Sequence, residues 1–159
     1  KAFNKIKKDK AILKICGKSP VNNGIFNYYH KVKRMARRSK NIEFMGAFDN
    51  KDIAKIFREI DVLIFPSLWQ ENSSLVLHEA ILTKTPVIAS DSGGVSELIK
   101  HAKNGLLFKA GDTADLFVQI QKVLNTPLLI EKMKAECIKI KDIKDNCRET
   151  EELYARILN

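Results

Sequence analysis

The stretch Val62-Leu-Ile-Phe-Pro-Ser-Leu-Trp-Gln-Glu71-Asn-Ser-Ser-Leu-Val-Leu-His-Glu79-Ala80 decides the fold. It reads as an apolar strand over 62–65, a polar loop, and then a helix over 74–83. The same alternation gives further strands at 12–16, 42–45, 86–89 and 105–108, and helices at 1–9, 23–39, 51–59, 94–101 and 112–125. Alternating strands and helices predict an α/β fold, a Rossmann-like parallel sheet with helices on both faces. We expect two more helices after Pro127, packed outside the sheet.

Composition places the chain among single globular domains. It has 159 residues, 45% hydrophobic and 30% charged, which suits one domain over residues 1–159. No apolar run reaches the roughly 20 residues of a membrane helix, and the basic start lacks the apolar segment of a signal peptide. Cys16, Cys137 and Cys147 show no CxxC spacing, so we predict reduced thiols in a cytoplasmic protein rather than disulfides or a zinc site.

Two glutamates are the strongest candidates for function. Glu79 lies on a helix that is apolar on most sides, and such a helix is buried. A buried Glu needs a partner, and none stands one turn away in sequence. Glu79 therefore lines a cleft or meets a distant group, unless it lies at the solvent edge of the helix. Glu71 stands in the polar loop before this helix.

Two strand-to-helix turns carry binding chemistry. In parallel sheets, ligands bind outside the carboxyl ends of the strands. One such turn covers 66–74 and holds Glu71; the other is Ser90-Asp-Ser-Gly93-Gly94. Paired glycines let a backbone approach a ligand closely, although many αβ turns have them for packing alone. Helix N-termini bind anions. Two adjacent turns of this kind, together with two carboxylates, predict a ligand site.

The net charge of +9 is concentrated in the run from His30 to Lys40. Apolar residues at helical spacing within this run predict a helix with a basic outer face. A solvated face is the ordinary explanation, and binding to anionic lipid headgroups or to a phosphate-bearing ligand is the functional one. Nucleic acid is not predicted as a partner, because the run lacks interleaved aromatic residues and no nucleic-acid module surrounds it. No cluster of His, Cys or acidic residues predicts a metal, and His78 reads as structural.

Five motifs, in order and spacing, resemble one family. They are Asn41-Ile-Glu-Phe-Met-Gly-Ala-Phe48, Asp61-Val-Leu-Ile-Phe-Pro-Ser67, Glu71-x7-Glu79, Thr85-Pro-Val-Ile-Ala-Ser-Asp-Ser-Gly-Gly-Val-Ser-Glu97 and Asn104-Gly-Leu-Leu-Phe108. Together they are similar to the C-terminal domain of the retaining GT-B-fold "group 1" glycosyltransferases, which use nucleotide sugars. The resemblance runs from Lys1 to about Val123. It implies a strand order 3-2-1-4-5-6, in which the family's first strand, with its Arg and Lys for the diphosphate, has no counterpart here. We therefore expect the chain to be a fragment that lacks this strand and the N-terminal acceptor-binding domain.

The resemblance implies roles for the glutamates and for the start of their helix. Glu79 corresponds to the glutamate that binds the ribose hydroxyls of the donor, and Glu71 to the one that faces the donor sugar and is linked to catalysis. The amides of Leu75 and Val76, at the helix N-terminus beside Ser74, would hold the distal phosphate. These roles are chemically reasonable, because a carboxylate accepts two bonds from a vicinal diol and a helix dipole stabilises a leaving diphosphate.

Other positions follow the family less closely. Phe48 and Asn50 fall where members contact the base, and Gly17 ends a strand at the same rim. Members often have Gly-Phe-Gly where this chain has the Asn72–Ser74 tripeptide, which puts donor-sugar contacts there in question while leaving a capping residue.

The implied activity is transfer of a sugar from a nucleotide-diphosphate donor to an acceptor with retained anomeric configuration, without a metal or other cofactor. The implied partners are the nucleotide sugar and the N-terminal domain, and the basic run adds an anionic membrane surface as a further expected partner. The expected place is the cytoplasm or the inner face of the membrane. Two alternatives stay open at this point: a sugar-nucleotide epimerase of the same fold, and a non-catalytic nucleotide-binding or membrane-docking module. The Glu71-x7-Glu79 spacing argues against the epimerase.

Overall fold

The computed structural model describes residues 1–17, 26–37, 39–141 and 143–158. Within them, the strands are β1 (Leu13–Cys16), β2 (Ile42–Gly46), β3 (Leu63–Phe65), β4 (Val87–Asp91) and β5 (Gly105–Lys109). The helices are α1 (Phe26–Ala36), α2 (Ile53–Arg58), α3 (Leu75–Leu82), α4 (Val95–Leu98), α5 (Thr113–Asn125), α6 (Leu128–Ala135) and α7 (Ile143–Leu158), with 3-10 turns η1 (Phe3–Lys5) and η2 (Asn50–Asp52).

The centre of the fold is a three-stranded parallel sheet in the order β3-β4-β5. Its middle strand β4 is buried from Val87 to Ser90. Successive residues of a strand face opposite sides of the sheet, so Ile88 enters one core and Val87 and Ala89 enter the other. Both faces of this sheet are therefore covered, as predicted for a parallel sheet.

Two apolar cores cover those faces. The first joins Ile88 and Leu106 to residues of η1, α5 and α6: Phe3, Ile120, Val123 and Met133. The second joins Val87 and Ala89 to residues of α2, α3 and α4: Phe57, Leu77, Ala80, Ile81 and Val95. Helix α5 begins at Thr113, after the N-cap residue Asp112, whose carboxylate accepts hydrogen bonds from the amides of Ala114 and Asp115.

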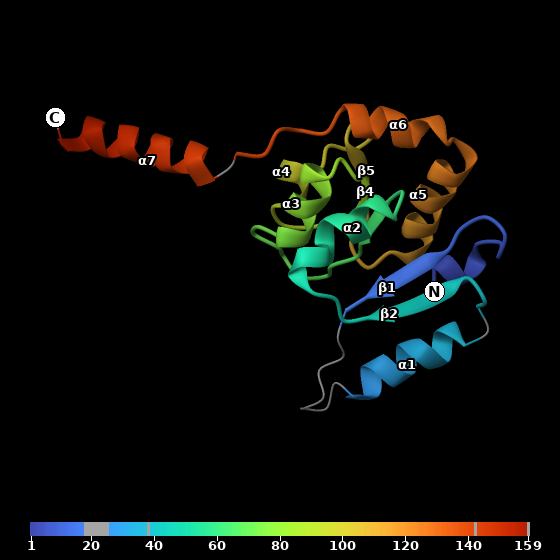
Figure 1. Cartoon of the computed structure of the whole chain (residues 1–159). Helices are drawn as coiled ribbons and strands as arrows, with labels where there is room; N and C mark the ends of the chain where they lie inside the picture. Colours follow the sequence, from blue (N-terminus) through green and yellow to red (C-terminus); the bar gives the residue numbers. More distant parts are fainter. Residues whose placement is uncertain (18–25, 38, 142, 159) are drawn as a thin grey trace.

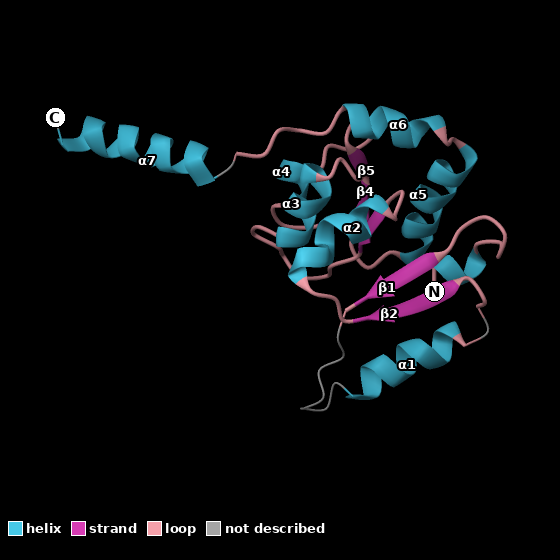
Figure 2. Cartoon of the chain, viewed as in Figure 1, coloured by secondary structure: helices cyan, strands magenta, loops and turns pink. Residues whose placement is uncertain are grey.

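A second sheet contains only β1 and β2, again parallel, and Figure 2 shows this pair apart from the other strands. The Asn41 side chain fixes the start of the pair, because its Nδ2 donates to the Ala11 carbonyl at 3.0 Å. Helix α1 contacts β2 through Tyr29, whose ring meets that of Phe44 edge to face at 6.0 Å. The predicted α/β fold is confirmed, as two sheets rather than one.

A groove of about 830 Å³ lies between β1 and β3. It is lined by Ala11–Lys14 on one side and 60–64 on the other, with Ile88 and Val123 beneath. Each of these strands has one edge without a strand partner among the described residues. Within each sheet, the observed neighbours β2-β1 and β3-β4-β5 agree with the predicted strand order. The predicted order of the two sheets across the groove remains a prediction.

Several predicted helix limits were wrong. The helix expected over 1–9 is only η1, because Ile6 adopts an extended conformation. The helix expected over 94–101 is only α4, because Ile99 is extended and the Asn104 side chain takes over the backbone bonds, accepting from Lys100 N at 2.7 Å and donating to Leu98 O at 2.8 Å. The helix predicted over 23–39 is observed over 26–36; residues 18–25 and 38 lie outside the described part.

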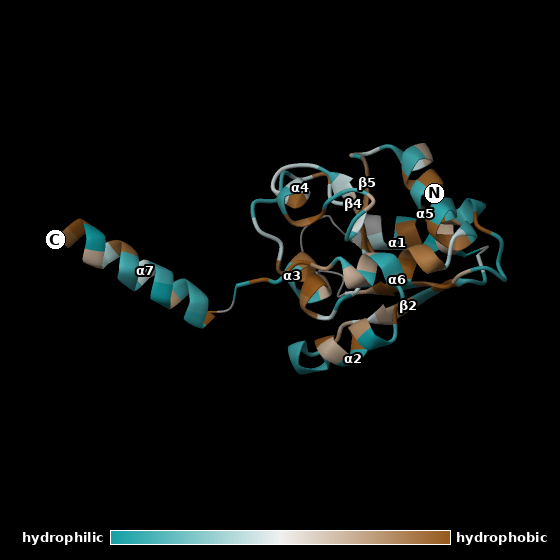
Figure 3. Cartoon of the chain, turned by 90° about the horizontal axis from the view of Figure 1, so that it is seen from above, coloured by the Kyte–Doolittle hydropathy of each residue, from teal (hydrophilic) through white to brown (hydrophobic). Residues whose placement is uncertain are grey.

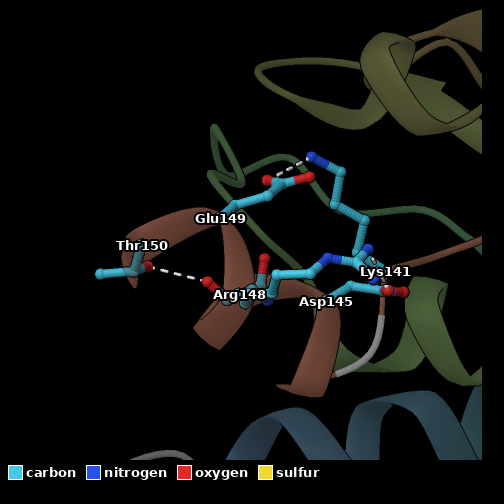
Figure 4. Close-up of polar contacts among 6 residues, drawn as sticks. Lys141, Asp145, Arg148, Glu149 and Thr150 are labelled. Carbon is cyan, nitrogen blue, oxygen red and sulfur yellow. Dashed lines mark hydrogen bonds and ion pairs between the residues drawn. The ribbon is translucent and has the colours of Figure 1, made fainter. Parts of the chain in front are cut away.

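Helix α7 also departs from expectation. We predicted that it packs outside the sheet, yet none of its residues is buried, and Figure 1 shows it extending away from the other elements. Its polar contacts are local: Lys141 pairs with Glu149 at 2.7 Å and Arg148 with Asp145 at 3.2 Å (Figure 4). Exposed pairs of this kind contribute little to stability. Among the described residues, no helix has the length and apolar composition needed to cross a bilayer.

Candidate functional site

The two turns that follow β3 and β4 contact each other directly. The amide of Gly94 donates to the Glu71 carbonyl at 2.7 Å, and Ser92 Oγ donates to the Trp69 carbonyl at 2.8 Å. Deeper in the sheet, Ser90 Oγ donates to the Ser67 carbonyl. The prediction that both turns lie at one place is therefore confirmed.

Gly93 and Gly94 make the close contact between the two turns possible. Gly93 has φ +56°, a left-handed conformation, and a Cβ on it would lie 2.6 Å from the Glu71 carbonyl oxygen. A Cβ on Gly94 would lie 2.6 Å from the Asn72 carbonyl oxygen. Both glycines thus let one turn approach the backbone of the other turn, which is the packing explanation rather than close approach to a ligand.

Glu71 is held in place from its own loop. Its side chain is half-buried, and Ser67 Oγ donates to Glu71 Oε1 at 3.1 Å. The same hydroxyl accepts from the Trp69 amide at 3.2 Å, so it fixes the loop and the carboxylate together. Since the Glu71 backbone carbonyl is bound to Gly94, this carboxylate has a defined position beside both turns.

Helix α3 presents free amides at its start. Ser74 is the N-cap residue, but its side chain makes no capping hydrogen bond, so the cap chemistry expected of Ser74 is only partly realised. Its carbonyl accepts from the amides of Leu77 and His78. The amides of Leu75 and Val76 precede the first intrahelical bond and have no acceptor within the helix. The side chains of these two residues are 77% and 41% exposed, so the helix start is open.

His78 has a structural role in the first turn of α3. Its Nδ1 lies 2.8 Å from the Ser74 carbonyl oxygen. A carbonyl only accepts hydrogen bonds, so Nδ1 carries the proton. This contact supports the structural interpretation of His78.

Glu79 lies further along α3 in a half-buried position. Its backbone carbonyl accepts from the amide and hydroxyl of Thr83, at 3.0 and 2.8 Å. Within the described part of the chain, its carboxylate has no hydrogen-bond donor or ion-pair partner. The neighbouring residues Leu77 and Ala80 are fully buried. A distant protein partner is absent among the described residues, so a cleft-lining carboxylate and a carboxylate at the solvent edge of the helix both remain as interpretations of Glu79.

The remaining predicted positions lie just after the strands of the other sheet. Gly17 follows β1, and its amide donates to the Gly46 carbonyl at the end of β2 at 2.8 Å. Phe48 is 45% exposed, and Asn50 begins η2 after the Asp49 cap. Among the described residues, no hydrogen bond joins this group to Glu71 or Glu79. Glu71, Ser74, Leu75, Val76 and Glu79 thus lie on α3 and the loop before it, whereas the three other predicted residues follow β1 and β2.

Sequence reasoning missed two serines. Ser67 orients Glu71, and Ser92 joins the two turns. Ser92 directly follows β4 and Ser67 stands two residues after β3, and this place at the carboxyl end of a strand is the signal that could have identified them. Among the described residues, no group of three His, Cys, Asp or Glu side chains could hold a metal ion, and the absence of a metal from the reaction remains a prediction.

Comparison with known proteins identifies the family. Residues 1–141 match the family model described as "Glycosyl transferases group 1". The chain belongs to the group 1 glycosyltransferase family. Among curated relatives, it is 32% identical over 96 residues to a phosphatidyl-myo-inositol mannosyltransferase of Mycobacterium leprae, covering 60% of this chain and 26% of that protein. It is 27% identical over 124 residues to D-inositol 3-phosphate glycosyltransferase 2 of Catenulispora acidiphila, covering 76% and 28%. The chain thus spans about a quarter of these two group 1 relatives.

Solved structures show the same fold. A glycosyltransferase from Rickettsia africae superposes with a TM-score of 0.83 at 21% identity, over 99% of this chain and 43% of that one. Anabaena HepE in complex with UDP superposes with a TM-score of 0.81 at 21% identity, over 91% and 41%. At this identity the likeness establishes the group 1, GT-B-type fold and no more.

Proposed function

We propose that this chain is the donor-binding half of a glycosyltransferase that takes a nucleotide-diphosphate sugar and transfers the sugar to an acceptor with retention of configuration. The observation that carries the proposal is Glu79, a half-buried carboxylate without a partner among the described residues, on the helix whose start exposes free amides. The complexes of Anabaena HepE with UDP and with UDP-glucose support a nucleotide sugar as the ligand class.

Each part of α3 suits a different part of such a donor. The Glu79 carboxylate can accept two hydrogen bonds from the vicinal hydroxyls of a ribose. The amides of Leu75 and Val76 and the positive end of the helix dipole suit the distal phosphate. Gly17, Phe48 and Asn50 would lie on the base side, contributed by the other sheet.

The proposed mechanism is electrostatic. When the bond between sugar and diphosphate breaks, negative charge grows on the leaving phosphate, and fixed amide dipoles stabilise that charge without reorganising. Glu71, positioned by Ser67 and by the Gly94 amide, would face the donor sugar, where positive charge develops. No metal is needed in this scheme.

Nucleotide affinity tests the role of Glu79. In a chain extended to the length of its relatives, Glu79→Gln should keep the fold and weaken nucleotide binding by about 1–3 kcal/mol, because a charged hydrogen bond is lost. Titration calorimetry with UDP, GDP and ADP gives the affinity and the base preference together. Glu136→Gln is the matched control, since Glu136 is exposed at the end of α6 and outside the candidate site. Equal affinity of the Glu79 variant and the control would remove Glu79 from the site.

Steady-state kinetics tests the role of Glu71. Glu71→Ala should lower kcat far more than it changes nucleotide affinity, as expected for an interaction made mainly in the transition state. A loss confined to KM would contradict this role. Product stereochemistry separates retaining transfer from epimerisation, in which no acceptor is consumed.

Residues 1–159 by themselves are expected to transfer no sugar. The chain spans about a quarter of its curated relatives, and holding donor and acceptor together supplies much of the rate of such reactions. Turnover by this chain with a full acceptor would show that the acceptor site also lies within it.

A further inference from the structure

Positive charge is distributed unevenly along the chain. Residues 1–41 hold 13 Lys and Arg and a single acidic residue, Asp9, so they carry +12. The net charge of the whole chain is +9, so residues 42–159 carry −3. The excess of positive charge in the first 41 residues is larger than that of the run at 30–40 alone, because the lysines of the N-terminal segment add to it.

The fold brings these two basic segments together. Asn4 of the N-terminal segment donates through Nδ2 to the Met35 carbonyl at 3.2 Å, near the end of α1. Ser39 Oγ then donates to Asn4 Oδ1 at 3.4 Å. Phe3, beside Asn4, is buried in the first core, which anchors the segment. We define the basic pole as six exposed cations on these segments: Lys1, Lys5, Lys31, Arg34, Arg37 and Lys40.

Helix α1 directs its charges outward. Tyr29 and Ala36 face the β1–β2 sheet, through the contact of Tyr29 with Phe44 and the burial of Ala36. Lys31 and Arg34, three residues apart on α1, are exposed on the side away from Tyr29 and Ala36, and Arg37 is exposed just past the end of the helix. In the described part of the chain, no member of the basic pole forms an ion pair with a carboxylate. Its charges are therefore available to an external anion.

We propose that the basic pole docks this domain onto an anionic lipid bilayer. The exposed cations of α1 can contact a flat surface at the same time. Clusters of four to eight Lys and Arg are typical of segments that bind anionic lipids. Met35, 37% exposed among these cations, supplies an apolar side chain for the interface. Nucleic acid fits less well, because no aromatic residue belongs to the basic pole and Tyr29 on α1 already packs edge to face against Phe44.

The basic pole shares no residue with either turn of the candidate site. Docking would therefore leave Glu71, the start of α3 and Glu79 open to a soluble donor. The proposal is also independent of the proposed function, because it can be tested without any nucleotide.

Vesicle co-sedimentation of residues 1–159 tests it. Vesicles of phosphatidylcholine alone are compared with vesicles containing about one-third phosphatidylglycerol, at about 0.1 M and about 0.5 M salt. The wild-type chain should bind only the anionic vesicles, and only at the lower salt. The triple variant Lys31→Glu, Arg34→Glu, Arg37→Glu should lose at least about tenfold in partitioning.

The matched control is Lys103→Glu, Lys122→Glu, Lys139→Glu, three exposed lysines outside the pole with the same change in net charge. It should lose less than about threefold, since these charges need not face the bilayer. If the charge reversals in α1 prevent folding, as judged by circular dichroism, the milder Lys31→Gln, Arg34→Gln, Arg37→Gln variant replaces them. Equal losses in both triple variants, or tighter binding to duplex DNA than to vesicles at equal phosphate, would overturn the proposal.

Discussion

The β3–β4–β5 sheet and the β1–β2 sheet contain equally apolar strands but differ in how those strands are buried. β4 is buried from Val87 to Ser90, whereas β1 has no fully buried residue. β4 has a strand on each side and helices on both faces, while β1 has one strand partner and borders the groove. An apolar strand therefore becomes core only when both its edges and its faces are covered.

The difference matters for the candidate site. Glu71 and Glu79 belong to elements built on the three-stranded sheet, and Figure 3 shows α3 as one of the more hydrophobic helices. Gly17 follows β1 of the two-stranded sheet, and Phe48 and Asn50 follow β2. The proposed phosphate and sugar contacts thus have a rigid support, and the proposed base contacts have a weaker one.

A pair of alanine substitutions tests the comparison most strongly. Ile88→Ala removes a side chain that is 2% exposed in the first core and should cost about 2–5 kcal/mol of unfolding free energy. Leu13→Ala, at the half-buried start of β1 beside the groove, should cost less than half as much, because water already reaches that side chain. Urea unfolding followed by circular dichroism measures both. Equal costs would show that the two sheets are equally well packed.

Two glycines of positive φ give a second test. Gly93→Ala places a Cβ 2.6 Å from the Glu71 carbonyl and should cost about 3 kcal/mol, from backbone strain and the displacement of a main-chain atom. Gly46→Ala, at the end of β2, has φ +75° but nothing within 4 Å of its Cβ, so only the strain of about 1–2 kcal/mol applies. Thermal unfolding should rank the two in this order, and the reverse order would argue against a tight contact between the two turns.

The strands could be predicted from sequence because they are short apolar runs, three of which end at Gly17, Gly46 or Pro66. The predicted strand at 42–45, for example, is observed over 42–46. The adjacency of the two turns also followed, since parallel strands end at the same edge of a sheet. Glu79 stood out because a carboxylate on an apolar helix is rare.

The remaining features depend on contacts that sequence does not display. The early end of α4 is caused by the Asn104 side chain, several residues further on. Gly93 and Gly94 face the backbone of the neighbouring turn rather than a ligand. The sequence does not show this, and it follows from the close approach of Gly94 to Asn72 in the structure. An amphipathic pattern in α7 predicts a helix but does not say what covers it.

Hydrogen exchange should resolve the two sheets strand by strand. The amides of β4 are bonded to β3 or β5 within a covered sheet, whereas β1 has an edge on the groove. We expect the β4 amides to exchange at least about tenfold more slowly than those of β1, because opening of the two-stranded sheet breaks fewer contacts. Mass spectrometry of peptides covering 11–17 and 86–92 gives the comparison. Similar protection in both would mean that the two sheets unfold as one unit.

The smallest expected effect concerns the end of the three-stranded sheet, where Asp115 joins β5 to α5. The amide of Lys109, together with Gln119 Nε2, donates to its carboxylate at 2.7 and 2.9 Å and lowers the pKa of Asp115 below its ordinary value. A carboxyl whose pKa is lower in the folded state adds stability that is complete above its unfolded-state pKa, about 3.9. That stability is lost as the pH falls through the lower folded-state pKa, since the unfolded state then binds more protons. Asp115→Asn should therefore reduce stability at neutral pH slightly and flatten its decline below about pH 4. Gln119→Leu removes one of the two donors and should retain part of the pH dependence. Urea titrations from about pH 6 to about pH 3 measure both variants, and an unchanged slope in Asp115→Asn would exclude this link as a source of stability in the better-packed sheet.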